Sequence, residues 1–240
     1  MQEIEFKFQV PVKKRKALQK AFTLLKAEPI HLAAQYFDTA DQTLAKHCIA
    51  IRRRQENDEW KQTFKAVDTA KVLSRLELEF DIAPPETTTL DLDNYKKDYS
   101  AIYKKLKRAL GLPLPTLELL FETNIQRLRV LQDVGNSTVE IALDIGKIFK
   151  EQNSVDIFEI EFELKQGSIE DLIAFIRPWI QKYQLSLDTH SKSDYGLLAV
   201  RQQSSFSAQY QTPLVLNRSS SEVEALQSIV ANCLQHLLPN

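Results

Sequence analysis

Seven segments of the chain alternate charged or polar residues with large apolar residues, and this alternation limits the possible folds more than any other feature. The first segment is EIEFK at residues 3–7, and the others are CIAIRRR, KQTFK, RLELEFD, QRLRV, EIALDIG and FEIEFELK. Successive side chains of a β-strand point to opposite faces, so each segment predicts a strand with one apolar and one charged face. One such strand alone is typical of a half-buried surface strand whose charges face water.

The recurrence of the pattern favours a different arrangement, in which the charged faces lie inside. Residues 12–27, 93–110 and 169–186 carry apolar side chains at helical spacing, and they predict amphipathic helices that can cover the apolar strand faces. If the apolar faces lie outward beneath these helices, the charged faces converge on the lumen of a sheet that closes on itself. Buried charges need partners, and a lumen with both signs of charge suits a polyanion together with hard cations.

Composition excludes several classes of partner. The formal net charge of the 240 residues is -1, so no overall basicity favours nucleic acid. Cys48 and Cys233 lie far apart and have no spacing for zinc or a redox pair, which predicts a reduced, cytoplasmic location. The N-terminus lacks an apolar signal region and no segment is long enough to span a bilayer, so no membrane association is expected.

The charged faces contain candidate ligands for metal ions and phosphate. Glu3 with Glu5, and Glu159 with Glu161, form carboxylate pairs that can hold Mg²⁺ or Mn²⁺. Arginine and lysine side chains bind phosphate oxygens. The candidates for this role are Lys7, Arg52, Arg54, Lys65, Arg75 and Arg127. The predicted chemistry is hydrolysis of a phosphoanhydride bond, in which positioning and electrostatic stabilisation supply most of the catalysis.

The ordered series of motifs resembles the CYTH domain of the triphosphate tunnel metalloenzymes. EIEFK fits the E-x-E-x-K signature of that family, and the resemblance continues in order through YFDTADQTLAKHCIAIRRR, TFKA, RLELEF, EIALDIG, FEIEFEL and HSKSDYG, over roughly residues 1–200. The resemblance implies an α+β fold in which an eight-stranded antiparallel β-barrel forms a tunnel, with helices packed on its outside.

Site roles follow from the resemblance residue by residue. It implies that Asp144 joins the metal-binding residues, and that Lys192 of SKSDYG binds the triphosphate, although a lone lysine in such a segment is more often at the surface. The implied metal ligands are Glu3, Glu5, Asp144, Glu159 and Glu161. The implied triphosphate-binding bases are Lys7, Arg52, Arg54, Lys65, Arg75, Arg127 and Lys192. The catalytic set is expected to consist of Lys7, Arg52, Arg54, Lys65 and Glu161.

Some residues on the charged faces keep two interpretations. Glu77 and Glu140 are in phase with the lumen and suit either a structural salt bridge or a catalytic role, and the role of Glu163 is also open. Arg53 lies between the paired arginines, where the family usually has an apolar residue, so it is expected to point outward.

The chain changes character after residue 202. Residues 1–202 are predicted to form the tunnel domain, and the polar, serine-rich residues 203–220 a linker. Residues 221–240 carry an apolar stripe at helical spacing and resemble the first helix of a CHAD domain, a helical module linked to polyphosphate. A lone amphipathic helix needs a partner, and self-association through this stripe is one possibility.

The leading hypothesis is a divalent-metal-dependent enzyme that hydrolyses inorganic triphosphate to pyrophosphate and phosphate. A tunnel mouth that accepts an organic group would instead permit thiamine or nucleoside triphosphatase activity, or class IV adenylate cyclase activity. The alternative from another functional class is a polyphosphate-binding module without turnover.

Overall fold

A computed structural model describes residues 4–67, 75–90, 92, 95, 99–208, 210, 213–216 and 219–238. Ten antiparallel strands form one sheet in the order β10-β1-β9-β8-β7-β2-β3-β4-β5, with β6 paired to β7. The strands are β1 (Glu5–Gln9), β2 (Glu28–Asp38), β3 (Ile49–Glu56), β4 (Glu59–Val67), β5 (Arg75–Ile82), β6 (Thr89–Leu90), β7 (Leu117–Val134), β8 (Ser137–Lys150), β9 (Asn153–Gln166) and β10 (Ser186–Leu187). The helices are α1 (Val12–Leu24), α2 (Thr43–Lys46), α4 (Ser100–Leu110), α5 (Ile169–Tyr183), α6 (Lys192–Arg201) and α7 (Glu222–Leu237).

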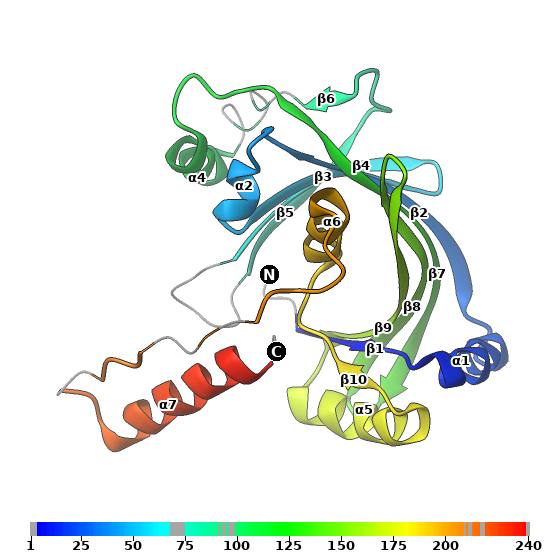
Figure 1. Cartoon of the computed structure of the whole chain (residues 1–240). Helices are drawn as coiled ribbons and strands as arrows, with labels where there is room; N and C mark the ends of the chain where they lie inside the picture. Colours follow the sequence, from blue (N-terminus) through cyan, green and yellow to red (C-terminus); the bar gives the residue numbers. More distant parts are fainter. Residues whose placement is uncertain are drawn as a thin grey trace.

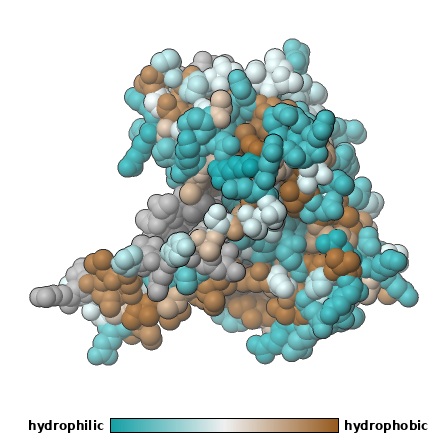
Figure 2. All heavy atoms as spheres, in the orientation of Figure 1, coloured by the Kyte–Doolittle hydropathy of each residue, from teal (hydrophilic) through white to brown (hydrophobic). Residues whose placement is uncertain are grey.

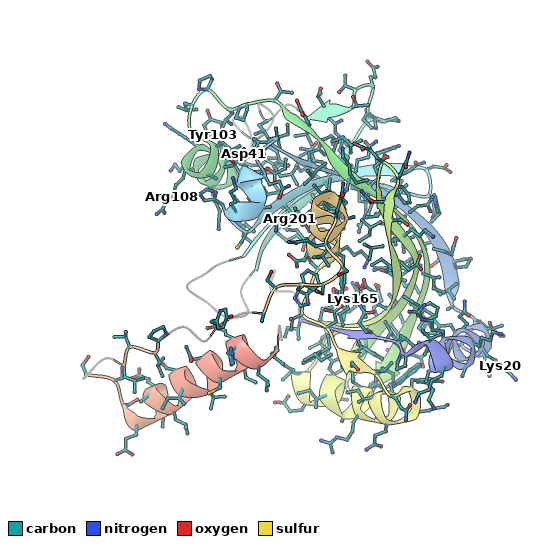
Figure 3. The ribbon with its side chains drawn as sticks, viewed as in Figure 1. Lys20, Asp41, Tyr103, Arg108, Lys165 and Arg201 are labelled. Carbon is teal, nitrogen blue, oxygen red and sulfur yellow. The ribbon has the colours of Figure 1, made fainter. Side chains whose placement is uncertain are left out.

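The sheet curves strongly, and the helices divide between its two faces (Figure 1). Helices α1 and α5 cover the convex side of β1, β8 and β9, while α2 and α4 cover the convex side of β3 and β4. Helix α6 lies on the concave side, against β7, β8 and β9. The labelled basic residues Lys20 of α1 and Arg108 of α4 project away from the sheet (Figure 3).

Strand register confirms that the alternating segments are strands with apolar faces on the convex side. All seven segments lie in strands from β1 to β9, except that Ile4 and Cys48 directly precede β1 and β3 and that Glu3 is outside the described residues. The apolar residues of β1, β8 and β9 pack with Leu18 and Phe22 of α1 and with Leu172 and Ile176 of α5 in one buried cluster. A second cluster joins β3 and β4 to α2 and α4. The charged residues therefore lie on the concave face.

The prediction of a closed eight-stranded barrel is wrong in two respects. Eight strands are five residues or longer, but the two-residue strands β6 and β10 bring the total to ten. The sheet is also open, because β5 and β1 are not paired among the described residues. The free edge of β1 is instead taken by β10, which pairs with it at Phe8 and Gln9. At these two positions β1 has no free edge for the ladder to β5 that closure of a barrel requires.

Helix α7 has no buried residue in the described part of the chain. Its exposed apolar side chains include Val223, Leu226 and Val230. Figure 2 shows brown surface at the lower left, where Figure 1 places this helix. A capping box between Ser221 and Glu224 begins the helix. The predicted C-terminal helix is thus present. Among the described helices, none combines the length and apolar character that a membrane crossing needs.

Helix α6 is held on the concave face by a third apolar cluster. This cluster contains Tyr36 and Phe121, whose rings stack with centroids 4.4 Å apart. Gly196 of α6 lies directly on the Phe121 ring, and a Cβ built on Gly196 would come within 2.2 Å of a ring carbon. The absence of a side chain at Gly196 thus lets α6 approach the sheet closely.

We predict that Gly196→Ala lowers the free energy of unfolding by about 1–3 kcal/mol, the usual cost of overpacking a filled interior. The stacked partner Tyr36 prevents Phe121 from simply moving aside. Chemical denaturation measures the effect, with Ser193→Ala on the same helix as the control. Equal stability of the two variants would show that α6 can shift at no cost.

Candidate functional site

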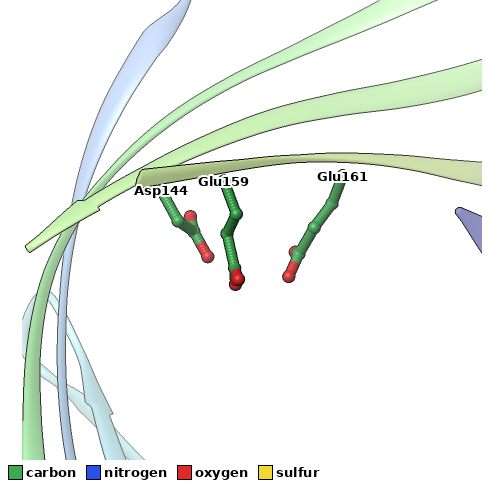
Figure 4. A group of neighbouring side chains, drawn as sticks. All are labelled: Asp144, Glu159 and Glu161. Atoms are coloured by element: carbon green, nitrogen blue, oxygen red, sulfur yellow. The ribbon is translucent and has the colours of Figure 1, made fainter. Parts of the chain in front are cut away.

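Three carboxylates converge at the centre of the concave face. Asp144 lies on β8 and Glu159 and Glu161 on β9, and one oxygen from each lies within 4.8 Å of the other two. Asp144 is directly opposite Glu159 in the β8–β9 ladder, and the side chains of both are fully buried. The three side chains project to the same side of the sheet (Figure 4). Like charges this close in a buried site require neutralisation.

Three bases from three different elements supply that neutralisation. Arg127 of β7 donates two parallel hydrogen bonds of 2.7 Å to Asp144 and a further one to Glu161. The ammonium of Lys192, at the start of α6, lies 2.7 Å from Asp144 Oδ2 and 2.9 Å from Glu161 Oε1, and it also contacts Glu159. Lys7 Nζ of β1 lies 3.3 Å from Glu159 Oε2. Three bases therefore face three carboxylates.

This environment shifts the pKa values of Glu159 and Glu161 in opposite directions. Burial raises the pKa of Glu159 above its ordinary value, against the opposing effect of Lys192 and Lys7. Burial acts in the same direction on Glu161, but Lys192 and Arg127 outweigh it and lower the pKa of that carboxyl well below its usual range. Burial would lower the pKa of Lys192, yet the three carboxylates raise it well above the ordinary value. Glu161 and Lys192 are thus both charged at neutral pH.

A second charged cluster lies on the same face of β3, β4 and β5. Arg54 Nη2 lies 3.2 Å from Glu79 Oε2 and 3.4 Å from Glu56 Oε2, and Lys65 Nζ lies 2.8 Å from Glu77 Oε2. Arg52 has no carboxylate within salt-bridge distance among the described residues and donates hydrogen bonds to Thr63 and to the Tyr36 hydroxyl, each 3.3 Å long. Arg52 therefore differs from Arg54 and Lys65, because its hydrogen-bond partners are neutral hydroxyl groups.

Tyr36 of β2 connects the two clusters electrostatically. Burial would raise the pKa of its hydroxyl, but Arg52 outweighs burial and lowers that pKa, with smaller contributions from Lys192 and Lys65. Lys192 belongs to the first cluster and Lys65 to the second. Tyr36 therefore lies near bases of both clusters.

The structure brings most of the predicted site residues onto this concave face. Asp144, Glu159 and Glu161 form the carboxylate cluster, and Lys7, Arg127 and Lys192 are in contact with it. Glu5 is exposed and is not part of that cluster; it lies opposite Glu163 in the β1–β9 ladder. Glu3 lies outside the described residues, as does the side chain of Arg75.

Glu77, Glu140 and Glu163, whose roles the sequence left open, each form a salt bridge with a lysine. Glu77 binds Lys65, while Lys165 Nζ (labelled in Figure 3) lies 3.6 Å from Glu140 and 2.7 Å from Glu163. Arg53 lies on the convex face as expected, where it donates to the Thr87 carbonyl and stacks over the Phe37 ring. The salt-bridge interpretation of Glu77 and Glu140 is the one that the geometry favours.

Residue patterns alone missed two side chains of this site. Lys192 was found only through the family resemblance, because the lysine starts a helix instead of following strand alternation. Tyr36 was not singled out at all. Tyr36 belongs to YFD, the last three residues of β2, and in the structure it is the ladder partner of Arg52. Alternation could have indicated the face of Tyr36, but its partner depends on the register between strands.

Comparisons with known proteins agree with this geometry. The CYTH domain family matches residues 1–194. The chain belongs to the CYTH family. An inorganic triphosphatase of Haemophilus influenzae (strain ATCC 51907 / DSM 11121 / KW20 / Rd) is 33% identical to it over 202 residues. The alignment covers 82% of this chain and 55% of that protein, so the chain spans little more than half the length of this CYTH relative.

Two solved structures share the fold of this CYTH chain. A putative adenylate cyclase from Bacillus halodurans is 20% identical with a TM-score of 0.55, and the match covers 80% of this chain and 96% of the other. A putative adenylyl cyclase from Hippeastrum, described as revealing a dominant triphosphatase activity, is 19% identical with a TM-score of 0.57 over 84% and 96% of the two chains. At these identities the likeness concerns the fold alone.

We predict that Arg127→Met lowers the free energy of unfolding by about 3–5 kcal/mol, since it removes one partner of a fully buried carboxylate. Arg129→Met on the same strand removes a half-exposed pair with Glu28 and should cost only about 0–1 kcal/mol. Urea denaturation at neutral pH compares the two variants. Equal losses would mean that the carboxylate cluster does not depend on Arg127.

Proposed function

We propose that this CYTH chain is a divalent-metal-dependent triphosphatase that cleaves inorganic triphosphate to pyrophosphate and phosphate on its concave face. The observation that carries the proposal is the buried cluster of Asp144, Glu159 and Glu161 beside bases from three elements. The similarity to the Haemophilus influenzae inorganic triphosphatase supports the choice of substrate. Because the chain spans only part of that relative, the activity is proposed and not transferred from it.

The donor set fits a hard divalent cation. Carboxylate oxygens are the preferred protein ligands of Mg²⁺ and Mn²⁺, and the three that converge here are close enough to share one ion. We propose Asp144, Glu159 and Glu161 as the ligands, with Glu3 and Glu5 as further candidates nearer the chain start. A bound ion would neutralise phosphate charge and make a water molecule more acidic.

The bases are proposed to exchange carboxylate partners for phosphate oxygens. Lys7, Arg127 and Lys192 are paired with the proposed metal-binding carboxylates. A linear triphosphate carries about four to five negative charges and would compete for these bases, which frees the carboxylates to bind a cation. Substrate and metal should therefore each favour binding of the other.

The opposite wall is proposed to hold the other end of the phosphate chain. Arg52, Arg54 and Lys65 face the same space, and Arg52 is free of carboxylate partners among the described residues. Arg75 is proposed from sequence alone to belong to this group. Bases on both walls would keep the phosphate chain extended, so that water can attack in line with the leaving group. The ionised Glu161 is proposed to orient that water by accepting a hydrogen bond from it.

The C-terminal segment fits the same function. We propose that residues 203–220 form a linker and that α7 is the first helix of a CHAD-like module. The apolar stripe of α7 is exposed, and no described part of the chain covers it, which fits a helix that packs against further helices. Such a module is linked to polyphosphate, a longer polymer of the same chemical unit as the proposed substrate.

We predict metal-dependent phosphate release from inorganic triphosphate that is abolished by chelator, and faster release than from ATP or thiamine triphosphate. Glu161→Gln should reduce kcat by at least about 10²-fold, because an amide is a poor ligand for a hard cation and a poor acceptor for the attacking water. The assay compares Mg²⁺, Mn²⁺ and chelator for all three substrates.

Asp156→Asn provides the matched control. Asp156 lies on the same strand as Glu161, but it is exposed and pairs with Lys147 at the surface. Its replacement should leave the rate unchanged. Tight triphosphate binding without phosphate release, with or without metal, would contradict the enzyme and support a polyphosphate-binding module. Faster turnover of ATP or thiamine triphosphate would reassign the substrate.

A further inference from the structure

Asp188 is a buried carboxylate that has no role in the proposed reaction. It lies between β10 and α6, and its residue is 8% exposed. Its side chain accepts hydrogen bonds from Gln9 Nε2 at 2.6 Å, Tyr195 OH at 2.9 Å and the His190 backbone N–H at 2.9 Å. Its backbone N–H also donates to the Lys7 carbonyl at 2.9 Å. Asp188 thus joins β1 to the N-terminal end of α6.

The same carboxylate holds the Lys7 ammonium. Lys7 Nζ lies 3.3 Å from Asp188 Oδ2 and 3.3 Å from Glu159 Oε2, and it donates to the His190 carbonyl. A lysine ammonium has three N–H donors, so these three oxygens satisfy it completely. Only one of the three, Glu159, belongs to the proposed metal ligands. If Glu159 binds a cation instead of Lys7, the ammonium can still keep Asp188 and the His190 carbonyl as partners.

Retaining these two partners leaves one Lys7 donor for a phosphate oxygen. Without the Asp188 charge, Glu159 would be the only carboxylate within salt-bridge distance of Lys7 among the described residues, and the lysine would bind it more firmly. Burial would raise the pKa of Asp188, but Lys7 and the hydrogen bond from Gln9 outweigh burial and lower it, so the group is ionised at neutral pH. The carboxylate is therefore available as a permanent counter-ion.

We propose that Asp188 is a positioning residue, which holds Lys7 ready to bind the triphosphate and limits its competition with the metal for Glu159. This inference rests on the proposed function, because the roles of Lys7 and Glu159 come from it. Asp188 acts through Lys7 and does not touch the substrate. Its loss should therefore weaken substrate binding more than it slows the chemical step.

The test is Asp188→Asn in the full chain, with inorganic triphosphate as substrate and Mg²⁺ at saturation. We expect KM to rise about tenfold, in line with the loss of a charged hydrogen-bond partner, while kcat changes by less than about threefold. In a Lys7→Met background the same substitution should change KM by less than about twofold, because the group through which Asp188 acts is gone.

Asp171→Asn is the matched control. Asp171 on α5 also accepts a short hydrogen bond, 2.6 Å from Ser137 Oγ, but it lies on the convex side. Its replacement should leave KM unchanged. If Asp188→Asn fails to fold, Tyr195→Phe removes one hydrogen bond to Asp188 and should raise KM about threefold, again only when Lys7 is present.

An unchanged KM in a folded Asp188→Asn variant would overturn the role of Asp188 and leave the triphosphatase intact. A tenfold effect that persists in the Lys7→Met background would show that Asp188 acts by another route, and would also overturn it. If the unmodified chain neither binds nor cleaves triphosphate, the proposed function fails and the inference fails with it.

Discussion

The rest of the structure depends on the neutralisation of Asp144 and Glu159. These two carboxylates are fully buried and directly opposite each other, and such a pair is unstable without cations in contact with it. The strands that carry them cannot provide those cations on their own. Arg127 comes from the neighbouring strand β7, Lys7 from β1 on the other side, and Lys192 from a helix on the concave face. The curvature of the sheet and the docking of α6 bring these elements together.

Apolar packing and charge pairing hold α6 in one position. Gly196 packs onto the Phe121 ring, and Tyr195 and Val200 pack against the same apolar cluster. These contacts place Lys192, the first residue of the helix, over the carboxylates. A capping box between Ser191 and Asp194 sets where the helix begins. The convex clusters beneath α1, α5, α2 and α4 stabilise the sheet independently, so the concave face can carry charge.

For the described charged residues of these strands, alternation predicted the face that each would occupy, because a period of two is a local property of the backbone. Sheet closure could not be predicted in the same way, since it depends on β10, two residues long, occupying the edge of β1. Lys192 and Asp188 are similar cases. Both belong to the segment around the start of α6, and the position of that segment is set by long-range contacts with Phe121 and Lys7. Family resemblance supplied the first residue, and the second required the structure.

We propose that the carboxylate cluster binds a divalent cation once triphosphate has drawn the bases away. Crystals grown with Mn²⁺ and a slowly cleaved triphosphate analogue would test it directly, because manganese can be located by its anomalous scattering. We predict a manganese peak in contact with Asp144, Glu159 and Glu161, with Lys192 moved from these carboxylates to the phosphate oxygens. Triphosphate bound with no manganese peak there, and with Lys192 still in contact with all three carboxylates, would contradict it.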